Sequence, residues 1–122
     1  MQTDDQAPCR ITSESVGAAV VVHVTGELDW DTADALSEQL GEVVHPASPV
    51  VLDLTAVGFL GAYGIRLLLE HHERCVRDGG AFSVVANTPV VLRPLQALEL
   101  EDVLNVRPSV PEALGRQGTP LA

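Results

Sequence analysis

Few residues in this chain are of the types that do chemistry, and most of them stand apart in the sequence. His71 and Cys75 are four positions apart, so on a helix they would share one face at a spacing that can chelate a metal ion. His72 and Cys9 are further candidate ligands. Because no second ligand pair with a recognisable spacing accompanies them, we predict a surface histidine and a half-buried cysteine, and no metal site.

The central glycines do not form a phosphate-binding motif. Gly58, Gly61 and Gly64 are spaced by three, which fits neither GxGxxG nor GxxxxGK[ST], and the chain has no lysine to complete a P-loop. A GxSxG nucleophile elbow is also absent. His23 and His45 have no obvious serine or cysteine partner in the sequence. We therefore predict no catalytic residue, no cofactor and no enzymatic activity.

The elements that must position these side chains follow from the hydrophobic pattern. Apolar, β-branched runs predict strands at residues 9–15, 18–28, 50–57, 81–87 and 103–107. Apolar residues at helical spacing predict helices at about residues 31–44, 59–77, 89–98 and from 110 onward. Alternation after a first hairpin implies an α/β fold with right-handed crossovers. The expected sheet has four to five mostly parallel strands, an N-terminal antiparallel edge and about four helices.

Helix ends and inward faces can be assigned from the same pattern. Asp31 is a plausible N-cap of the first helix, Thr88 precedes Pro89 at the start of the third, and Ser109 to Glu112 form an S-x-x-E capping box. The residues expected to face inward are Ala33, Leu36, Leu40 and Val44, then Ile65, Leu68, Leu69, His72 and Val76, then Leu92, Leu95, and Leu98 or Ala97.

Composition limits the class of protein. The 122 residues favour one domain at 9–116, with flexible ends at 1–8 and 117–122. A net charge of −10 disfavours nucleic-acid binding. The acidic run between Glu27 and Glu42 is read as a solvated face, although a docking surface for a basic partner is the alternative. Without a signal peptide or an apolar run long enough to span a membrane, we expect no membrane association and a cytoplasmic location.

Three segments carry a resemblance to a known family: GELDWDTADALSEQL, VVLDLTAVGFLGAYGIRLLL and the late SVPEAL. They resemble the STAS domain of the bacterial anti-sigma factor antagonists, also called anti-anti-sigma factors, over about residues 9–116. In that family, the resemblance implies, the junction between strand and helix reads D-S-S-G after an apolar pair. Its second serine is phosphorylated by an anti-sigma factor that is a serine kinase of the histidine-kinase-like ATPase fold. Only the unphosphorylated antagonist binds the anti-sigma factor and frees the sigma factor.

The phosphorylation motif is degenerate in this chain. Phe59 and Leu60 match the apolar pair, and the D-S-S-G positions are occupied by Gly61, Ala62, Tyr63 and Gly64. The Tyr63 hydroxyl would lie several ångströms further from the backbone than a serine hydroxyl, so a serine kinase would not position it. Thr55 and Ser37 are weaker alternative acceptors. Asp29, by contrast, matches the family's acidic residue near the site, and Thr32 and Ala33 match its first helix.

The resemblance implies a non-enzymatic binding module for a kinase-type anti-sigma factor, not switched by the usual phosphorylation. The expected docking face comprises Asp29, Asp31, Gly58, Phe59, Leu60, Tyr63 and Arg66. The alternative is a STAS scaffold that binds another signalling protein or a small ligand, or assembles with itself, for example as a homodimer. Tyr63 itself could anchor a partner, block one, or simply cover the apolar strand end.

Overall fold

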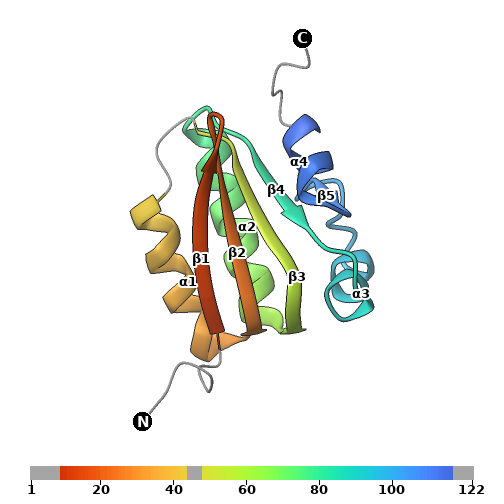
Figure 1. The fold of residues 1–122 in the computed structure, drawn as a ribbon. Helices are drawn as coiled ribbons and strands as arrows, with labels where there is room; N and C mark the ends of the chain where they lie inside the picture. The colour runs from red at the N-terminus through yellow and green to blue at the C-terminus, as the bar shows by residue number, and fades with distance from the viewer. Residues whose placement is uncertain (1–8, 44–47, 117–122) are drawn as a thin grey trace.

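The computed structural model describes residues 9–43 and 48–116, which form a five-stranded sheet in the order β1-β2-β3-β4-β5 (Figure 1). The first two strands, β1 (Cys9–Val16) and β2 (Ala19–Leu28), are antiparallel. The remaining pairings, through β3 (Val50–Leu60), β4 (Phe82–Val85) and β5 (Val106–Arg107), are parallel. The predicted α/β class and its antiparallel N-terminal edge are confirmed.

Four helices accompany this sheet among the described residues: α1 (Trp30–Val43), α2 (Ala62–Arg77), α3 (Pro89–Ala97) and α4 (Val110–Arg116). Figure 1 shows α1 and α2 behind one face of the sheet, with α3 to one side of β3 and α4 toward the opposite face. The expected flexible ends, 1–8 and 117–122, lie outside the described residues, as does Val44.

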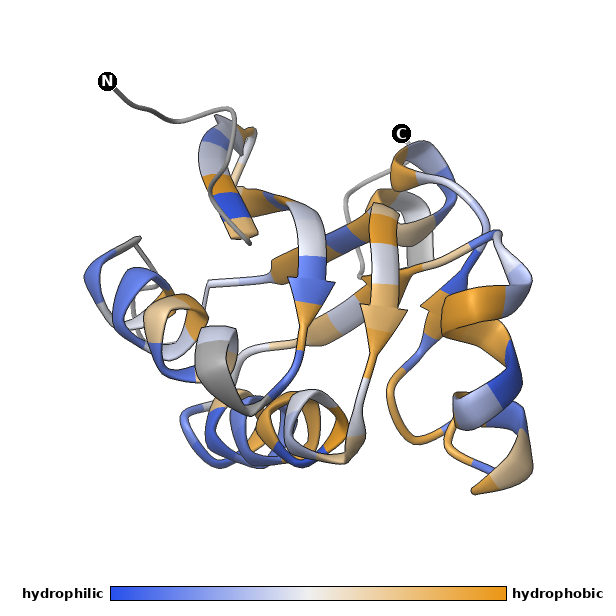
Figure 2. Ribbon diagram, turned by 90° about the horizontal axis from the view of Figure 1, so that it is seen from below, coloured by the Kyte–Doolittle hydropathy of each residue, from blue (hydrophilic) through white to orange (hydrophobic). Residues whose placement is uncertain are grey.

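Alternation along the strands divides the apolar side chains between two cores. The main core lies under α1, α2 and α3 and takes Val22 and Val24 from β2 and Leu52 and Leu54 from β3. A small second core under α4 takes the side chains that point the other way, Val21, Val51, Val85 and Ala113. Helix α4 has only seven residues and does not cover the whole of that face. The polar Glu14 and His23 lie on its β1–β2 part, and the ribbon of β1 is coloured largely hydrophilic or neutral in Figure 2.

The boundaries around the junction differ from the predicted ones. Strand β3 continues three residues further, through Leu60, and α2 begins at Ala62. Helix α1 begins at Trp30, so the N-cap position belongs to Asp29 and not to Asp31. The later start of α2 has a clear cause: the backbone of residues 59–61 still pairs with the end of β2, which delays that helix.

The inward faces of two helices were partly mispredicted. On α2 the buried residues are Gly64, Ile65, Leu67, Leu68, His71 and Cys75, while Val76 is 55% exposed. On α3, Val91 and Leu95 are buried, whereas Leu98 is 58% exposed. Leu98 is the C-cap of α3 and Glu99 follows with a left-handed φ of 58°, so the chain turns away before Leu98 can face inward. Ala97 is exposed as well.

The predicted caps are found in altered form. Thr88 takes the N-cap position before Pro89, but its hydroxyl makes no capping bond and is buried without a hydrogen-bond partner. Ser109 caps α4 by accepting a bond from the backbone N–H of Glu112 at 3.3 Å. The Ser109 hydroxyl in turn donates a hydrogen bond to Oε1 of Glu112 at 3.1 Å, which completes a local variant of the capping box.

Candidate functional site

The ends of β2 and β3 and the start of α2 meet at one end of the sheet. The backbone N–H of Gly61 donates to the carbonyl of Leu28 at 2.8 Å, and Gly61 is the N-cap residue of α2. Ala62, Tyr63 and Gly64 therefore occupy the first turn, where backbone N–H groups have no partner within the helix. Residues 61–64, the four positions aligned with the D-S-S-G motif, thus span the N-cap and first turn of α2, at the positive end of the helix.

Two of the junction glycines are held in place by packing. A Cβ on Gly64 would stand 2.8 Å from the carbonyl oxygen of Leu28 and 2.8 Å from Cδ1 of Leu60. A Cβ on Gly61 would stand 3.0 Å from Cε2 of Phe59 and 3.8 Å from Cβ of Asp29. Backbone blocks any side chain at Gly64, whereas Gly61 meets an aromatic ring that can move.

Asp29 is presented beside this junction by a loop that Thr32 holds. The buried Thr32 hydroxyl donates to the carbonyl of Glu27 at 2.6 Å and accepts from the backbone N–H of Asp29 at 3.0 Å. Residues 27–29 are thereby tied to the first turn of α1. Thr32 thus has a structural role that the sequence analysis did not assign to it.

The junction exposes two aromatic side chains. Phe59 is 46% exposed and Tyr63 is 53% exposed, and Gly58 beside them is also exposed. Arg66 extends into solvent one turn further along α2, with Nε 3.5 Å from Oε2 of Glu70. Large exposed aromatic side chains at one site are typical of binding surfaces.

One member of the predicted docking face, Leu60, is placed differently from expectation. Leu60 is 6% exposed and belongs to the main core, because residues alternate along β3 and its neighbour Phe59 faces out. It can offer a partner only its backbone. Asp31 lies in the first turn of α1, and its side chain is outside the described part of the chain. Among the described residues, the members of this predicted face that are at least partly exposed are Asp29, Gly58, Phe59, Tyr63 and Arg66.

The alternative phosphate acceptors lie elsewhere and are already hydrogen-bonded. Ser37 lies in α1, with Oγ 3.2 Å from Nε2 of His71. The Thr55 hydroxyl donates to Oδ1 of Asp53 at 2.8 Å. Neither hydroxyl lies in the first turn of α2.

The predicted surface histidine is in fact buried. His71 is 8% exposed and Cys75 is 9% exposed, because both lie on the face of α2 that packs against the core. Burial, helped by Arg74, lowers the pKa of His71, and burial raises the pKa of the Cys75 thiol. Among the described residues no group of three or more His, Cys, Asp or Glu side chains is arranged to hold a metal ion.

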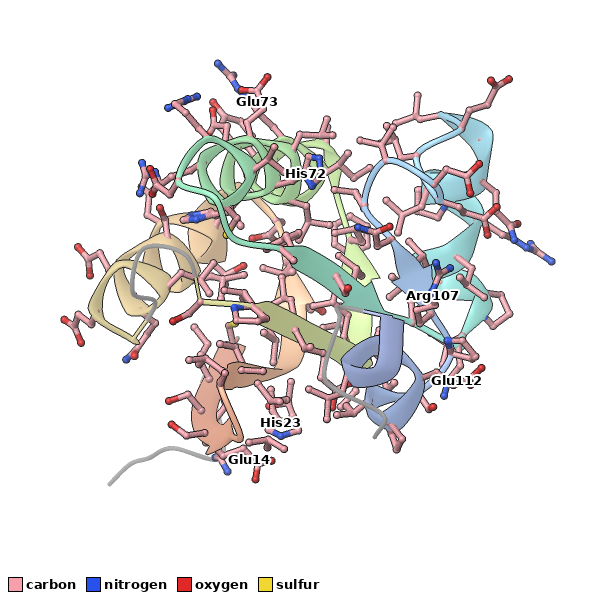
Figure 3. The ribbon with its side chains drawn as sticks, turned by 90° about the horizontal axis from the view of Figure 1, so that it is seen from above. Glu14, His23, His72, Glu73, Arg107 and Glu112 are labelled. Carbon is pink, nitrogen blue, oxygen red and sulfur yellow. The ribbon has the colours of Figure 1, made fainter. Side chains whose placement is uncertain are left out.

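A polar array that sequence reasoning missed lies on the open face of the sheet. His23 Nδ1 is 2.7 Å from Oδ2 of Asp53, and its Nε2 is 2.7 Å from Oε2 of Glu14 (Figure 3). The hydrogen bond to Glu14 is the main cause of a raised pKa at His23. Burial alone would raise the pKa of Asp53, but hydrogen bonds from Thr55 and His23 lower it.

This array is not a nucleophilic triad. Both nitrogens of His23 face carboxylates, so neither can take a proton from a hydroxyl or thiol. The signal that could have revealed it is alternation: His23 follows Val21 by two residues and so shares its face of the sheet. Pairing it with Glu14 and Asp53 required the strand register.

The family of this chain follows from residues 10–113, which match the model of the STAS domain. The chain therefore belongs to the STAS domain family. It is 34% identical over 106 residues to the anti-sigma-F factor antagonist RsfB of Mycobacterium tuberculosis. The matched residues cover 85% of this chain and 85% of that relative. The predicted family is confirmed.

Solved structures agree with this assignment. An anti-sigma factor antagonist from Mycobacterium paratuberculosis superposes with a TM-score of 0.83 at 32% identity, covering 98% of this chain and 100% of that one. The phosphorylated form of the Bacillus cell fate determinant SpoIIAA gives a TM-score of 0.66 at 17% identity, covering 88% and 98%, and shows a shared fold. No helix in the described residues is long and apolar enough to cross a membrane.

Proposed function

We propose that this protein is a non-enzymatic, cytoplasmic anti-sigma factor antagonist that binds an anti-sigma factor of the histidine-kinase-like ATPase fold. One observation carries the proposal: Phe59 and Tyr63 are both exposed where α2 begins, and the N-cap Gly61 between them lies beside Phe59 and Asp29. The similarity to RsfB, whose name describes an antagonist of an anti-sigma factor, supports the same function.

The same motif supports a protein that phosphorylation does not switch off. The first turn of α2 holds Ala62, Tyr63 and Gly64 after the Gly61 cap, so it contains no serine or threonine. A phosphate there would add close to two negative charges to the docking face, which is how modification could release a partner. Without an acceptor, the docking face keeps its charge when ATP is present. Such an antagonist would free its sigma factor constitutively.

Binding can be tested with purified candidate anti-sigma factors, measured with and without Mg-ATP and followed by intact mass. We expect binding that persists with ATP and no mass gain of one phosphate. Phe59→Ala and Tyr63→Ala should each weaken binding by at least about tenfold, as anchors at an interface centre do. The matched control is Val76→Ala, an exposed apolar residue further along the same helix, which should bind like the parent chain. Failure of every candidate factor to bind would move the function to another signalling partner or ligand.

Restoring the motif tests whether only the acceptor is missing. A double variant with Ala62→Ser and Tyr63→Ser, and a triple variant that adds Gly61→Asp, should each gain one phosphate in the presence of an active kinase. Each should then lose the binding that persists with ATP in the parent chain. The variant that keeps Gly61 is needed for comparison with the one that carries Gly61→Asp. An aspartate at position 61 must displace the Phe59 ring and places a second carboxylate near Asp29, which could disturb the junction by itself. If both variants stay unmodified while the kinase phosphorylates its own antagonist, the proposed partner class is wrong.

A further inference from the structure

Strand β1 is an exposed sheet edge of unusual regularity. It has eight residues, ends the strand order, and pairs with β2 without a register shift from Cys9 to Val16. Sheet edges are normally protected by proline, by charged side chains and lysine above all, by a bulge or by a very short strand, because their unpaired backbone groups recruit another strand. The two charged residues of β1, Arg10 and Glu14, have opposite signs. Strand β1 has no proline, lysine or bulge. Its outer side is therefore suited to pairing with a further strand.

The hairpin decides which backbone groups point outward. Gly17 and Ala18 form a two-residue turn, so the flanking pair Val16 and Ala19 is hydrogen-bonded, and pairs alternate from there. An independent contact agrees: the N–H of Val20 donates away from β1, to the carbonyl of Pro49 at 2.9 Å. The outward backbone groups on β1 consequently belong to Cys9, Ile11, Ser13 and Ser15.

We propose that this edge pairs with β1 of a second copy of the chain, antiparallel and centred on Thr12. In an antiparallel pair, residues whose backbone groups point outward on one copy must bond to residues of the same kind on the other. Because these are every second residue of β1, a twofold axis can pass only through a residue and not between two residues. Centring on Thr12 bonds Ile11 to Ser13 of the second copy, and Cys9 to its Ser15. Sheets of the two copies then join into one continuous sheet across the twofold axis.

Charge selects this register. Centred on Thr12, the Arg10 side chain stands opposite Glu14 of the second copy, twice in the dimer, in non-hydrogen-bonded pairs where Cα atoms are only about 4.5 Å apart. Centred on Ser13, the same number of residues pairs, but Thr12 faces Glu14 and Arg10 faces Val16. Arg10 is the only basic residue before Phe59 in a chain of net charge −10.

The Glu14 carboxylate can serve both neighbours. Its Oε2 contacts His23 on the same face of the sheet, and Arg10, Thr12 and Glu14 share that face with His23 by the strand register. Its other oxygen, Oε1, is left to accept the guanidinium of the second copy. A dimer through β1 does not depend on the antagonist function, because it uses only the edge of the sheet.

Sedimentation equilibrium of the full chain from about 10 μM to 1 mM, the range of weak association, tests the dimer. We expect a monomer–dimer equilibrium. Ser13→Pro should abolish it, since the outward N–H is lost while the bonds to β2 remain, and proline is tolerated on an edge. Ser13→Ala keeps the N–H and should dimerise like the parent chain. A parent chain that is monomeric at about 1 mM, or a Ser13→Pro chain that still dimerises, overturns the proposal.

Charge reversal tests the register. Arg10→Glu and Glu14→Arg should each raise the dimer dissociation constant at least about tenfold, because each places like charges opposite each other twice. An equimolar mixture of the two variants should form a heterodimer with affinity restored toward that of the parent. The contact of Glu14 with His23 is lost in the Glu14→Arg chain whether alone or mixed, so restoration reports the pairing alone. Two folded variants that do not associate on mixing would contradict a dimer centred on Thr12.

Discussion

Gly64 in the first turn of α2 lies so close to Leu28 at the end of β2 that a Cβ would stand 2.8 Å from the Leu28 carbonyl oxygen. That oxygen also accepts the N–H of Gly61 at 2.8 Å. The helix therefore starts directly against the strand backbone. The backbone oxygen of Leu28 limits how closely α2 can approach β2 at Gly64. This close approach sets the position of Tyr63, the residue before Gly64, at the surface.

Gly64→Ala should destabilise the fold, because the added methyl group meets backbone that cannot move alone. A loss of about 1 to 3 kcal/mol in the free energy of unfolding is expected for such overpacking. The matched control is Gly41→Ala in α1, where a Cβ meets nothing within 4 Å. That change should be neutral or stabilise the helix by about 0.5 kcal/mol. Urea unfolding of both variants measures the contrast, and equal stabilities would show that the junction can relax.

The buried face of α2 can be checked with two apolar truncations on the same helix. Leu68 is fully buried and Val76 is 55% exposed. Leu68→Ala should cost about 2 to 5 kcal/mol through lost burial and a cavity. Val76→Ala should stay within about 0.5 kcal/mol of the parent chain. A large loss at Val76 in chemical denaturation would favour the face first predicted from the sequence.

The His23 array should make stability depend on pH at both ends of a window. The pKa of His23 is raised above 6.5, so its contribution is full below that value and is lost as the pH rises through the folded-state pKa. The pKa of Asp53 is lowered below 3.8, so its contribution is full above that value and is lost as the pH falls further. Together they contribute most between about pH 4 and 6.5.

Substitutions can separate this pH dependence from that of the remaining groups. His23→Gln should flatten the expected fall in stability above pH 6.5, as measured by urea unfolding at a series of pH values. Glu14→Gln should shift that fall to lower pH, since the hydrogen bond that His23 donates to the Glu14 carboxylate is the main cause of the raised pKa. A parent-like profile in both variants would mean that His23 ionises alike in the folded and unfolded chains.

Tyr63→Ser should change binding without changing stability. Tyr63 is 53% exposed, and substitutions at such surface positions usually stay within about 0.5 kcal/mol. The thermal midpoint of unfolding should therefore match that of the parent chain. A marked drop would instead support the interpretation that the ring mainly covers the apolar end of the strand.

Local sequence was enough for the order of elements and for much of the core. Valine-rich runs predicted β2 and β3, and helical spacing placed Ala33, Leu36 and Leu40 inward, as observed. Several wrong predictions concern the ends of elements: strand β3 continues through Leu60, and Leu98, at the end of α3, is exposed. Hydrophobic periodicity repeats within an element, but an element ends where backbone bonds to a neighbour stop, and that neighbour is distant in sequence.

By itself, the sequence determined the STAS family, the α/β order, and which residues occupy the motif after Leu60. Only the tertiary structure decided that Leu60 turns inward while Phe59 turns out, that His71 is buried, and that His23 lies between Glu14 and Asp53. The reason is physical. Residue types and their spacing are local properties, whereas burial, strand register and contacts between carboxylates and imidazole depend on which distant backbones the fold brings together.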